Sequence, residues 1–387
     1  MRIALIGTRG VPANYGGFET CVEEVGARLA DAGHEVIVYC RTAAKNERGH
    51  QLSSYRGMEL VHLPAVHRRS LETLTHSTLS IAHVVLRRKA DVALVFNAAN
   101  SPLLPILRLA GLPVATHVDG LEWQRSKWGP IGQRYYRLAE SAAVRWSDAL
   151  IADALGISDY LEGEFGADSE LLVYGAPLIR SSNPELLLPL GLTPKRYHLV
   201  VARLEPENHV DVIVDGYVRS AAKLPLVVVG SAPYAEQYSA RVRSLADARV
   251  RMLGGVWDQD LLNELYTNAL TYFHGHSVGG TNPSLLRAIG AGTATDAFDS
   301  SFNREVLGQA GRYWSSAAEV ASLVMSTEAD CGAAVGRGES SRVRAAAYDW
   351  DDVARGYEQL CLRLADRELS RTGLSGRRTG SSRESGR

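Results

Sequence analysis

The 387-residue chain has no excess of either charge, because 42 Lys and Arg residues stand against 43 Asp and Glu residues. A protein dedicated to nucleic acid normally carries a basic excess that neutralises phosphates, so this balance argues against that class. No run of apolar residues approaches the roughly 20 that a membrane-spanning helix needs. Glycines at positions 7 and 10 come too early for a signal peptide, so we expect a cytoplasmic protein.

Cysteine and lysine are also scarce. The cysteines are too scattered for a disulfide framework or a CxxC metal site, which fits a reducing compartment. They are Cys21, Cys40, Cys331 and Cys361. Arginine dominates the cations, which we attribute to a GC-rich genome, and lysine is limited to Lys45, Lys89, Lys127, Lys195 and Lys223.

Short β-branched runs alternate with helical patterns in the first half of the chain. Residues 2–7 form an apolar run that ends in glycine, which is typical of a buried parallel strand. Helical spacing follows over residues 18–32 and stops at Gly33. Further expected strands are residues 35–40, 91–96, 113–117, 149–152 and 170–174. This alternation predicts βαβ units in a parallel, doubly wound sheet.

The pattern lapses between about residues 177 and 195, where prolines and serines suggest an interdomain linker. It then restarts, with expected strands at 197–202, 226–230, 250–253, 270–273 and 293–297 and helices at 210–222, 260–269 and 284–291. We therefore expect an α/β protein with two Rossmann-like domains that face a central cleft, where ligands bind at the C-terminal ends of both sheets. The expected boundaries are 1–180 and 196–345 for the domains, 346–367 for a closing helix and 368–387 for a disordered tail.

A glycine-rich loop, GTRGVPANYGGFE over residues 7–19, joins the first strand to the first helix. Glycines let backbone N–H groups approach an anion, and the start of the helix adds a positive dipole. The loop matches neither GxGxxG nor GxxxxGK[ST], so dinucleotide-binding and P-loop interpretations fail. We favour a diphosphate or sugar cradle, with a turn that merely needs glycine as the alternative.

Two further loops follow strands of the second half. Arg203 stands at the end of one strand, where its guanidinium fork suits a diphosphate, and a salt bridge with Glu205 or Glu207 is the alternative. The second loop, HGHSVGGTNPSLL over residues 274–286, would present N–H and hydroxyl donors to an anion, with Asn282 as the N-cap of the next helix. Its HGH pair lacks an assignable third ligand, so we expect no metal.

His117 and Asp119 follow a strand of the first half, in the sequence HVDGLEW. They alternate onto one side if the strand continues, which makes them candidates for binding sugar hydroxyls or for accepting a proton from an acceptor hydroxyl. An ordinary hydrogen-bonded loop is the alternative.

Two charged patterns have plain alternatives. Residues 258–260, DQD, resemble a metal-binding DxD, but they stand where helix capping predicts an aspartate. Cations bracket an apolar helical stretch that faces either an anionic membrane or solvent. These cations are Arg68, Arg69, Arg87, Arg88 and Lys89.

Taken together, these motifs resemble the GT-B glycosyltransferases of family 4, in particular a rhamnosyltransferase-like branch. The resemblance runs from residue 1 to about residue 365 and rests on GTRGVPANYGGFET, VDGLEWQRSKWG, VYGAP, ARLEPEN, GGVWDQDLLNELY, HGHSVGGTNPSLL and FNREVLG. It implies a retaining, metal-independent transfer, without a cofactor, of a sugar from a dTDP- or UDP-linked donor. A deoxyhexose such as rhamnose is one candidate sugar, and a glycan, a lipid-linked glycan or a natural product is the candidate acceptor. Peripheral contact with the inner face of the membrane is a further expectation.

The resemblance also implies roles for single residues. His117, Asp119 and Arg203 would be catalytic, with Arg203 neutralising the leaving diphosphate. The donor-binding set would be Gly16, Gly17, Asn208, Gly280, Thr281, Asn282, Pro283, Ser284 and Arg287. The acceptor side would contain Arg9, Tyr15 and Glu122.

One position departs from the family. Two glutamates usually stand eight residues apart around the last turn, and here they are Gly279, which is normal for the branch, and Arg287. The second glutamate typically binds the donor ribose. The reversed charge leaves three possibilities: another donor, a contact of Arg287 with phosphate, or lost activity. The alternatives to an active transferase are a non-catalytic nucleotide-binding partner of another transferase and a nucleotide-sugar epimerase.

Overall fold

The structure, a computed structural model, describes residues 1–13, 16–42, 52–66, 72–87, 90–118, 120–125, 128–231, 236–370 and 374–378. The chain divides into two compact units. Unit 1 comprises Met1–Tyr174 and Trp350–Arg387, and unit 2 comprises Gly175–Asp349. Each unit is an α/β layer structure built on a mainly parallel sheet, so the predicted α/β class with two Rossmann-like domains is confirmed. Among the described helices, none is both long and apolar enough to cross a membrane.

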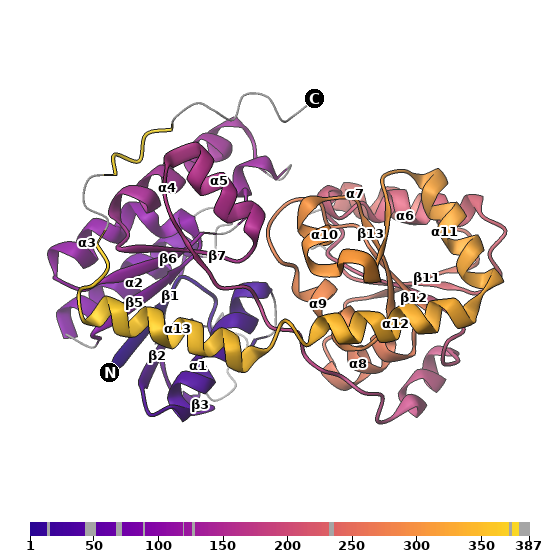
Figure 1. Ribbon diagram of the computed structural model, residues 1–387, viewed down its shortest axis with the longest axis horizontal. Coiled ribbons are helices and arrows are strands. Elements are labelled where there is room, and N and C mark those ends of the chain that lie inside the picture. Colours follow the sequence, from indigo (N-terminus) through magenta and orange to yellow (C-terminus); the bar gives the residue numbers. More distant parts are fainter. Residues whose placement is uncertain are drawn as a thin grey trace. The chain divides into compact units, whose positions relative to one another are not determined.

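Within the described residues, the sheet of unit 1 has eight strands, of which only the edge strand β3 is antiparallel to its neighbour (Figure 1). Its spatial order is β3 (Ser54–Tyr55), β4 (Met58–Leu63), β2 (Glu35–Arg41), β1 (Arg2–Ile6), β5 (Val92–Phe96), β6 (Val114–His117), β7 (Ala149–Ala152) and β8 (Glu170–Leu171). The inner strands are apolar runs because helices cover both of their faces. The sequence reading missed β4, because this half-exposed strand near the edge alternates apolar and polar residues.

Helices cover both faces of this sheet. They are α1 (Gly17–Asp31), α2 (Glu72–Arg87), η1 (Ala98–Leu103), α3 (Leu104–Leu109), η2 (Glu122–Gln124), α4 (Pro130–Trp146), α5 (Leu155–Phe165) and α13 (Trp350–Ala365). The closing helix α13 lies beside α1 (Figure 1), where Arg28 Nε and Asp351 Oδ1 are 2.6 Å apart and His34 Nε2 and Glu358 Oε1 are 2.8 Å apart. Right-handed connections place α2, α3 and α4 on the opposite face.

Part of the C-terminal segment differs from the expected disordered tail. Arg378 Nη2 lies 2.7 Å from Glu140 Oε2 on α4, and its Nη1 lies 3.0 Å from Glu164 Oε1 on α5. Both carboxylates are almost fully buried, and burial raises the pKa of Glu140 to about 7. The arginine also donates to the hydroxyl of Tyr160. A buried carboxylate needs a partner cation, and here that cation comes from residues 374–378.

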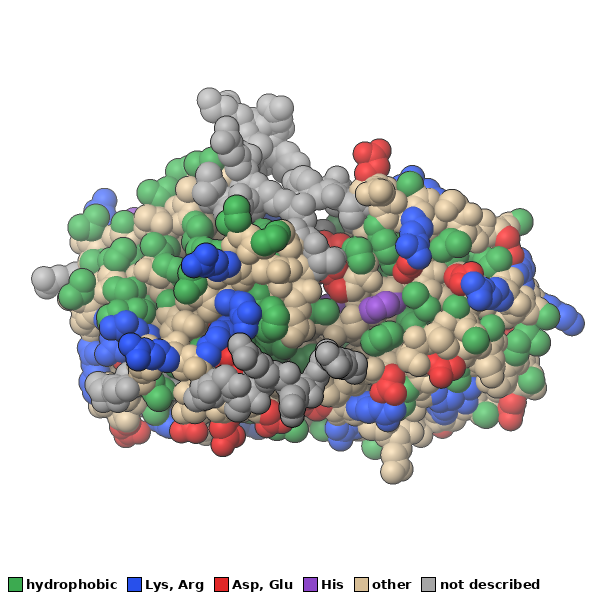
Figure 2. Space-filling model, turned by 90° about the horizontal axis from the view of Figure 1, so that it is seen from above, with side chains coloured by type: hydrophobic (Ala, Val, Ile, Leu, Met, Phe, Trp, Pro, Cys, Tyr) green, Lys and Arg blue, Asp and Glu red, His purple; other side chains and the backbone are tan. Residues whose placement is uncertain are grey.

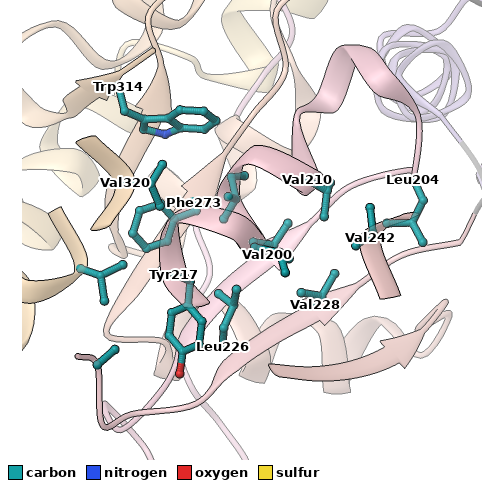
Figure 3. Close-up of a cluster of buried hydrophobic side chains, with 14 residues drawn as sticks. Val200, Leu204, Val210, Tyr217, Leu226, Val228, Val242, Phe273, Trp314 and Val320 are labelled. Atoms are coloured by element: carbon teal, nitrogen blue, oxygen red, sulfur yellow. The ribbon is translucent and has the colours of Figure 1, made fainter. Parts of the chain in front are cut away.

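The sheet of unit 2 has six parallel strands. Their order is β11 (Val250–Gly254), β10 (Leu226–Val229), β9 (His198–Val201), β12 (Thr271–His274), β13 (Ala294–Phe298) and β14 (Arg312–Trp314). The helices are η3 (Pro184–Leu190), η4 (Pro206–Asn208), α6 (Val210–Arg219), α7 (Glu236–Leu245), α8 (Gln259–Asn268), α9 (Pro283–Gly290), α10 (Ser301–Leu307), η5 (Gly308–Ala310), α11 (Ala317–Ala329) and α12 (Cys331–Ala345). Figure 3 shows its core, where Trp314, Phe273 and Tyr217 pack against valines of β9 and β10.

The stretch expected to be a linker is packed onto unit 2. Three donors of this stretch bond the carboxylate of Glu264 on α8: the Ser181 hydroxyl at 2.7 Å, the Ser182 N–H at 2.6 Å and the Asn183 N–H at 2.8 Å. Leu187 of η3 is fully buried. The prolines and serines that suggested a linker therefore form a hydrogen-bonded turn and a 3₁₀ helix.

Candidate active site

The strand order of each sheet reverses at one point, and such points are where doubly wound sheets bind ligands. In unit 2 the chain runs outward from β9 through β10 to β11, and from β12 through β13 to β14 in the other direction. The loops after β9 and β12 therefore leave the same edge of the sheet side by side. In unit 1 the corresponding reversal lies between β1 and β5.

In unit 2, Asn208 ties these two loops together. Its Nδ2 donates to the carbonyl of Arg203 at 2.8 Å, and its Oδ1 lies 2.8 Å from Nδ1 of His276 in the second loop. The carbonyl of Glu207 accepts from the backbone N–H and the hydroxyl of Ser277. A Cβ on Gly275 would lie 2.0 Å from the carbonyl oxygen of Asn208, so only glycine fits this approach. Asn208 thus positions the site, since its amide already has both partners.

Arg203 follows β9 at this edge, as the sequence predicts. Its side chain is 40% exposed, and Nη2 lies 3.6 Å from Oε2 of Glu205. The ion pair that we weighed as the alternative is therefore present, but it is long and partly exposed, and such pairs contribute little. The guanidinium remains available to an anion.

The turn over residues 279–284 leads into α9. Gly279 has a φ of 129°, a conformation that favours glycine. Asn282 caps the helix, as predicted, by accepting the N–H of Ser284 at 2.9 Å. Pro283 has no N–H, and the N–H of Ser284 is already bonded to the N-cap side chain. Neither residue therefore offers the free backbone donor that we expected. The other residues of this turn are Gly280, which is partly buried, and Thr281, which is buried, with the helix dipole behind them.

Arg287 lies one turn further along α9. Its Nη2 donates to Oε1 of Gln259 at 2.9 Å, whereas its Nη1 is buried without a hydrogen-bond partner. Burial lowers the pKa of this arginine from its ordinary value. The hydroxyl of Tyr266 is also buried without a partner. An unsatisfied cation that is largely shielded from water is costly, which favours an anionic or oxygen-rich ligand at this position.

Two patterns that suggested a metal have other roles. Asp258 is the N-cap of α8 and accepts the N–H groups of Asp260 and Leu261, so capping is confirmed. His274 is buried beside the hydroxyl of Tyr272, and burial lowers its pKa to about 3. In the described part of the chain, no cluster of three or more His, Cys, Asp or Glu side chains is arranged to hold a metal ion.

The first loop of unit 1 uses several of its N–H groups internally. The N–H of Arg9 donates to Oε1 of Glu19 at 3.0 Å, and that of Ala13 donates to Oε2 of Glu23 at 2.5 Å. Burial raises the pKa of Glu19, which stands in the first turn of α1. Gly16 is the N-cap residue of that helix with a φ of 110°, directly before Gly17, and a Cβ added at Gly16 would lie 2.6 Å from Oε2 of Glu19. The carboxylates of Glu19 and Glu23 therefore lie against this loop, which is unfavourable for binding a diphosphate.

His117 is the last residue of β6 and is 1% exposed. Its ring packs against Phe18 at 5.0 Å, Phe96 at 5.5 Å and Tyr174 at 5.9 Å between centroids. Both ring nitrogens are buried without a hydrogen-bond partner. Burial lowers the pKa of His117 to about 3, so the imidazole is neutral near pH 7. A neutral ring with an unused donor and acceptor suits hydroxyl groups.

The other residues of unit 1 that the sequence assigns to the site are not brought together by the described structure. Glu122 forms an ion pair with Arg125 and accepts the indole N–H of Trp128, so this buried carboxylate holds its own loop. Arg9 is half exposed, with Nη2 lying 3.9 Å from Glu72 Oε2. Tyr15 and Asp119 lie outside the described residues, as do Arg68, Arg69, Arg88 and Lys89.

Sequence reasoning missed two polar residues at the reversal point of unit 1. Asn100 and Ser101, in η1 after β5, are fully buried, and Asn100 Oδ1 and Ser101 Oγ lack partners. Asn100 Nδ2 donates to the carbonyl of Phe96 at 2.8 Å. One feature of the sequence could have identified them: both residues follow β5, the strand beside β1. That strand borders the point at which the strand order of the sheet reverses.

Comparison with known proteins agrees with this architecture. The model of the family described as "Glycosyl transferase 4-like domain" matches residues 16–175, and that of "Glycosyl transferases group 1" matches residues 190–325. The chain is a GT-B glycosyltransferase. No curated protein sequence matches this GT-B chain significantly.

Several solved structures share the fold. Sucrose-phosphate synthase from Thermosynechococcus elongatus is 18% identical, with a TM-score of 0.80 over 95% of this chain and 99% of that one. Anabaena Alr3699/HepE in complex with UDP-glucose is 16% identical, with a TM-score of 0.74 over 93% and 99%. An alpha,alpha-trehalose-phosphate synthase (UDP-forming) from Burkholderia vietnamiensis is 10% identical, with a TM-score of 0.65 over 95% and 97%.

Proposed function

We propose that this glycosyltransferase moves a sugar from a nucleoside-diphosphate donor, held mainly by unit 2, to a hydroxyl of an acceptor held mainly by unit 1. The observation that carries the proposal is the cationic edge of unit 2. Arg203 follows β9, and Arg287 lies in the last turn of α9, the helix that follows the neighbouring strand β12 at the reversal point of the sheet. Guanidinium groups and a helix N-terminus are what a diphosphate prefers. The Anabaena relative in complex with UDP-glucose supports this reading.

In the proposed reaction, negative charge builds up on the departing diphosphate. Arg203 and the start of α9 neutralise that charge as the bond between the anomeric carbon and the diphosphate breaks, and the sugar passes through an oxocarbenium-like state. The acceptor hydroxyl then bonds to the anomeric carbon on the face that the diphosphate leaves, with retention, and its proton passes to the departing phosphate oxygen. No protein nucleophile and no metal are needed in this scheme. The rigid Asn208 contacts hold the two loops in place before the donor arrives, which is how preorganised electrostatics accelerates a reaction.

His117 has a binding role in this proposal. A group with a pKa of about 3 is a weak base at neutral pH, so His117 does not take the proton of the acceptor. Its unused ring nitrogens instead donate one hydrogen bond and accept another, which fits a sugar hydroxyl between the rings of Phe96 and Tyr174.

Arg287 bears on which nucleotide-linked donors fit the site. A guanidinium only donates hydrogen bonds, so it donates to phosphate oxygens or to the oxygen of a ribose hydroxyl, and it does not need both hydroxyls of a ribose. We therefore include dTDP-linked donors beside UDP-linked ones, with a deoxyhexose such as rhamnose as the candidate sugar. The acceptor is a glycan, a lipid-linked glycan or a natural product. With a lipid-linked acceptor the enzyme works peripherally at the inner face of the membrane.

A donor screen tests the proposal. The purified chain is incubated with UDP- and dTDP-linked hexoses and deoxyhexoses, and both the release of nucleoside diphosphate and the thermal midpoint are measured. At least one donor should raise the midpoint and release diphosphate, and Arg203→Ala should abolish the release. If no donor does either, the proposed transfer is wrong. Binding without release under every acceptor tried would instead identify a non-catalytic nucleotide-binding partner.

A further inference from the structure

One residue at the C-terminal edge of the unit 2 sheet has a strained backbone. His209, which follows Asn208 directly, has a φ of 45° and a ψ of 32°, in the left-handed region. Glycine adopts this conformation freely, whereas a Cβ makes it unfavourable, so a histidine persists there only where its contacts compensate. The side chain is half-buried, and Figure 2 shows a histidine at the visible surface of unit 2. Burial in a core therefore does not account for a histidine at this position.

The imidazole of His209 is held by two neighbours from two other strand ends. Its Nδ1 lies 2.8 Å from the carbonyl oxygen of Gly275, which follows β12. Because a carbonyl only accepts, Nδ1 carries the proton and donates. The ring also stacks on Phe298, the last residue of β13, with the centroids 4.3 Å apart and the planes 9° apart. His209 therefore joins the ends of β9, β12 and β13.

Asn303 of α10 contacts the same segment of backbone. It is 2% exposed, and its Nδ2 donates to the carbonyl of His276 at 2.9 Å and to that of Phe298 at 2.8 Å. The residue belongs to the sequence FNREVLG, which has no role in the proposed transfer. Phe298 is thus held at its ring by His209 and at its carbonyl by Asn303.

These contacts fix the backbone that leads into the turn over residues 279–284. The consecutive carbonyls of Gly275 and His276 each accept from a side chain of another element, and the next N–H, that of Ser277, donates to the carbonyl of Glu207. Peptide planes with such partners have little freedom to rotate. The path into the turn is therefore set before any ligand is bound.

We propose that His209 and Asn303 are positioning residues for the turn over residues 279–284. They act through the carbonyls of Gly275 and His276, and they hold the turn and the start of α9 in the geometry that receives the departing diphosphate. The inference rests on the proposed sugar transfer. Preorganised dipoles accelerate a reaction only while their orientation is kept, so loosening this segment lowers the rate more than it lowers donor affinity.

His209→Gly tests the role of the ring. Glycine removes the ring contacts and also relieves the backbone strain, so the two effects on stability oppose each other and Tm should shift by no more than about 3 °C. In steady-state transfer assays kcat should fall about tenfold, while KM for the donor changes less than about threefold. His209→Asn should recover most of the rate, because asparagine tolerates the left-handed region and keeps an N–H donor.

Asn303→Ala tests whether the two residues act together. This variant leaves the carbonyls of His276 and Phe298 without their side-chain donor, and it should lower both kcat and Tm. Because both residues hold one segment, the double variant with His209→Gly should lose less of kcat than the product of the two single losses. Losses that simply multiply would mean that the residues act independently, which contradicts the proposal.

A matched control lies at the other end of β9. Lys195 also has a left-handed backbone, with a φ of 59°, and its Nζ donates to the carbonyls of Thr267 at 2.8 Å and Ala269 at 3.1 Å. Lys195→Gly therefore makes the same change at the N-terminal edge of the sheet, away from the turn. It should keep the wild-type kcat even where Tm falls.

Hydrogen exchange of the ligand-free protein separates this proposal from the proposed function. The amides of residues 276–282 should exchange faster in His209→Gly and as in the wild type in Lys195→Gly. Wild-type exchange in His209→Gly, an unchanged kcat in that variant, or an equal loss of kcat in Lys195→Gly overturns the proposal while the transfer stands. A wild-type protein that transfers from no donor refutes the transfer instead, and hydrogen exchange then decides alone whether the two residues hold the turn.

Discussion

The reversal points of the two sheets share a topology and differ in charge. In each unit, a loop after a central strand leads into a helix beside the loop of the neighbouring strand. In unit 1 the N–H groups of Arg9 and Ala13 are taken by the carboxylates of Glu19 and Glu23, and the unsatisfied groups include the neutral ring of His117 and the side-chain oxygens of Asn100 and Ser101. In unit 2 the carboxylates of Glu205 and Glu207 follow β9, but no carboxylate occupies the turn before α9, and the unsatisfied groups include the cation Arg287.

This difference in charge is the basis on which we assign the two proposed ligands. In the proposed function, the edge of unit 2 binds the anionic donor, whereas the edge of unit 1 offers neutral hydrogen bonds between aromatic rings to a hydroxyl-bearing sugar. A doubly wound sheet therefore fixes where a ligand binds, while a few side chains at the strand ends decide which charge it carries.

Removing the charge of Arg203 should have the largest effect. We expect Arg203→Ala to lower kcat by about 10²–10³-fold, because it removes a preorganised charge at the leaving diphosphate. Arg203→Lys should recover part of the rate, since it keeps the charge and loses the fork. Steady-state transfer assays measure both. Arg219→Ala, at an exposed ion pair with Asp215 on α6, is the control and should be neutral. A wild-type rate in Arg203→Ala would remove this residue from the reaction.

Acid should destabilise both units through their buried histidines. Burial lowers the pKa of His76 to about 4 and those of His117 and His274 to about 3. Below pH 6.5 the unfolded chain binds protons that these native rings do not, so stability is full above that pH and falls toward the native pKa values. At pH 5 each ring costs about 2 kcal/mol. Unit 1 contains two of these rings, but its Glu140, whose pKa is raised to about 7, binds a proton in the native state and offsets about one of the two costs.

Hydrogen exchange of strand amides at pH 7 and pH 5 measures these losses. The amides of β1 and β5 and those of β9 and β12 should lose protection to about the same extent. A loss confined to one sheet, or losses that begin only below pH 4, about the native pKa of His76, would contradict the account.

His117 should affect the acceptor rather than the donor. We expect His117→Ala to lower kcat/KM for the acceptor by about 30-fold, which corresponds to hydrogen bonds lost in a buried site. His117→Asn should recover part of this loss because it keeps a neutral donor and acceptor. The wild-type rate should show no step near pH 6.5 that depends on His117. A step that disappears in His117→Asn would mean that the ring titrates as a base.

Arg287 should have the smallest of these effects. Its Nη2 is already bound to Gln259, so Arg287→Gln should weaken nucleoside-diphosphate binding by about tenfold, as measured by calorimetry. Arg287→Glu should weaken it further, since it places an anion beside the diphosphate. Tighter binding in Arg287→Glu would show instead that the arginine impairs the site.

The sequence predicted the parallel sheets and the strand ends well, because these depend on local patterns. The apolar runs of β1 and β9, and the caps Asp258 and Asn282, lie where expected. Arg203 lies at the end of its strand for the same reason.

Longer-range contacts could not be predicted in the same way. Whether Glu19 turns into the first loop depends on the path of that loop, and the pairing of Arg378 with Glu140 joins residues 238 positions apart. Buried Asn100 and Ser101 are ordinary polar residues in the sequence, and only their burial without partners marks them.

Calorimetric titration with nucleotides tests the central claim most directly. Wild-type protein and Arg203→Ala are each titrated with UDP and dTDP and with the corresponding monophosphates. The account predicts that the wild type binds a diphosphate at least about tenfold more tightly than its monophosphate, and that Arg203→Ala loses this preference. Equal affinity for both in the wild type, or an unchanged preference in Arg203→Ala, would contradict the anionic character assigned to the edge of unit 2.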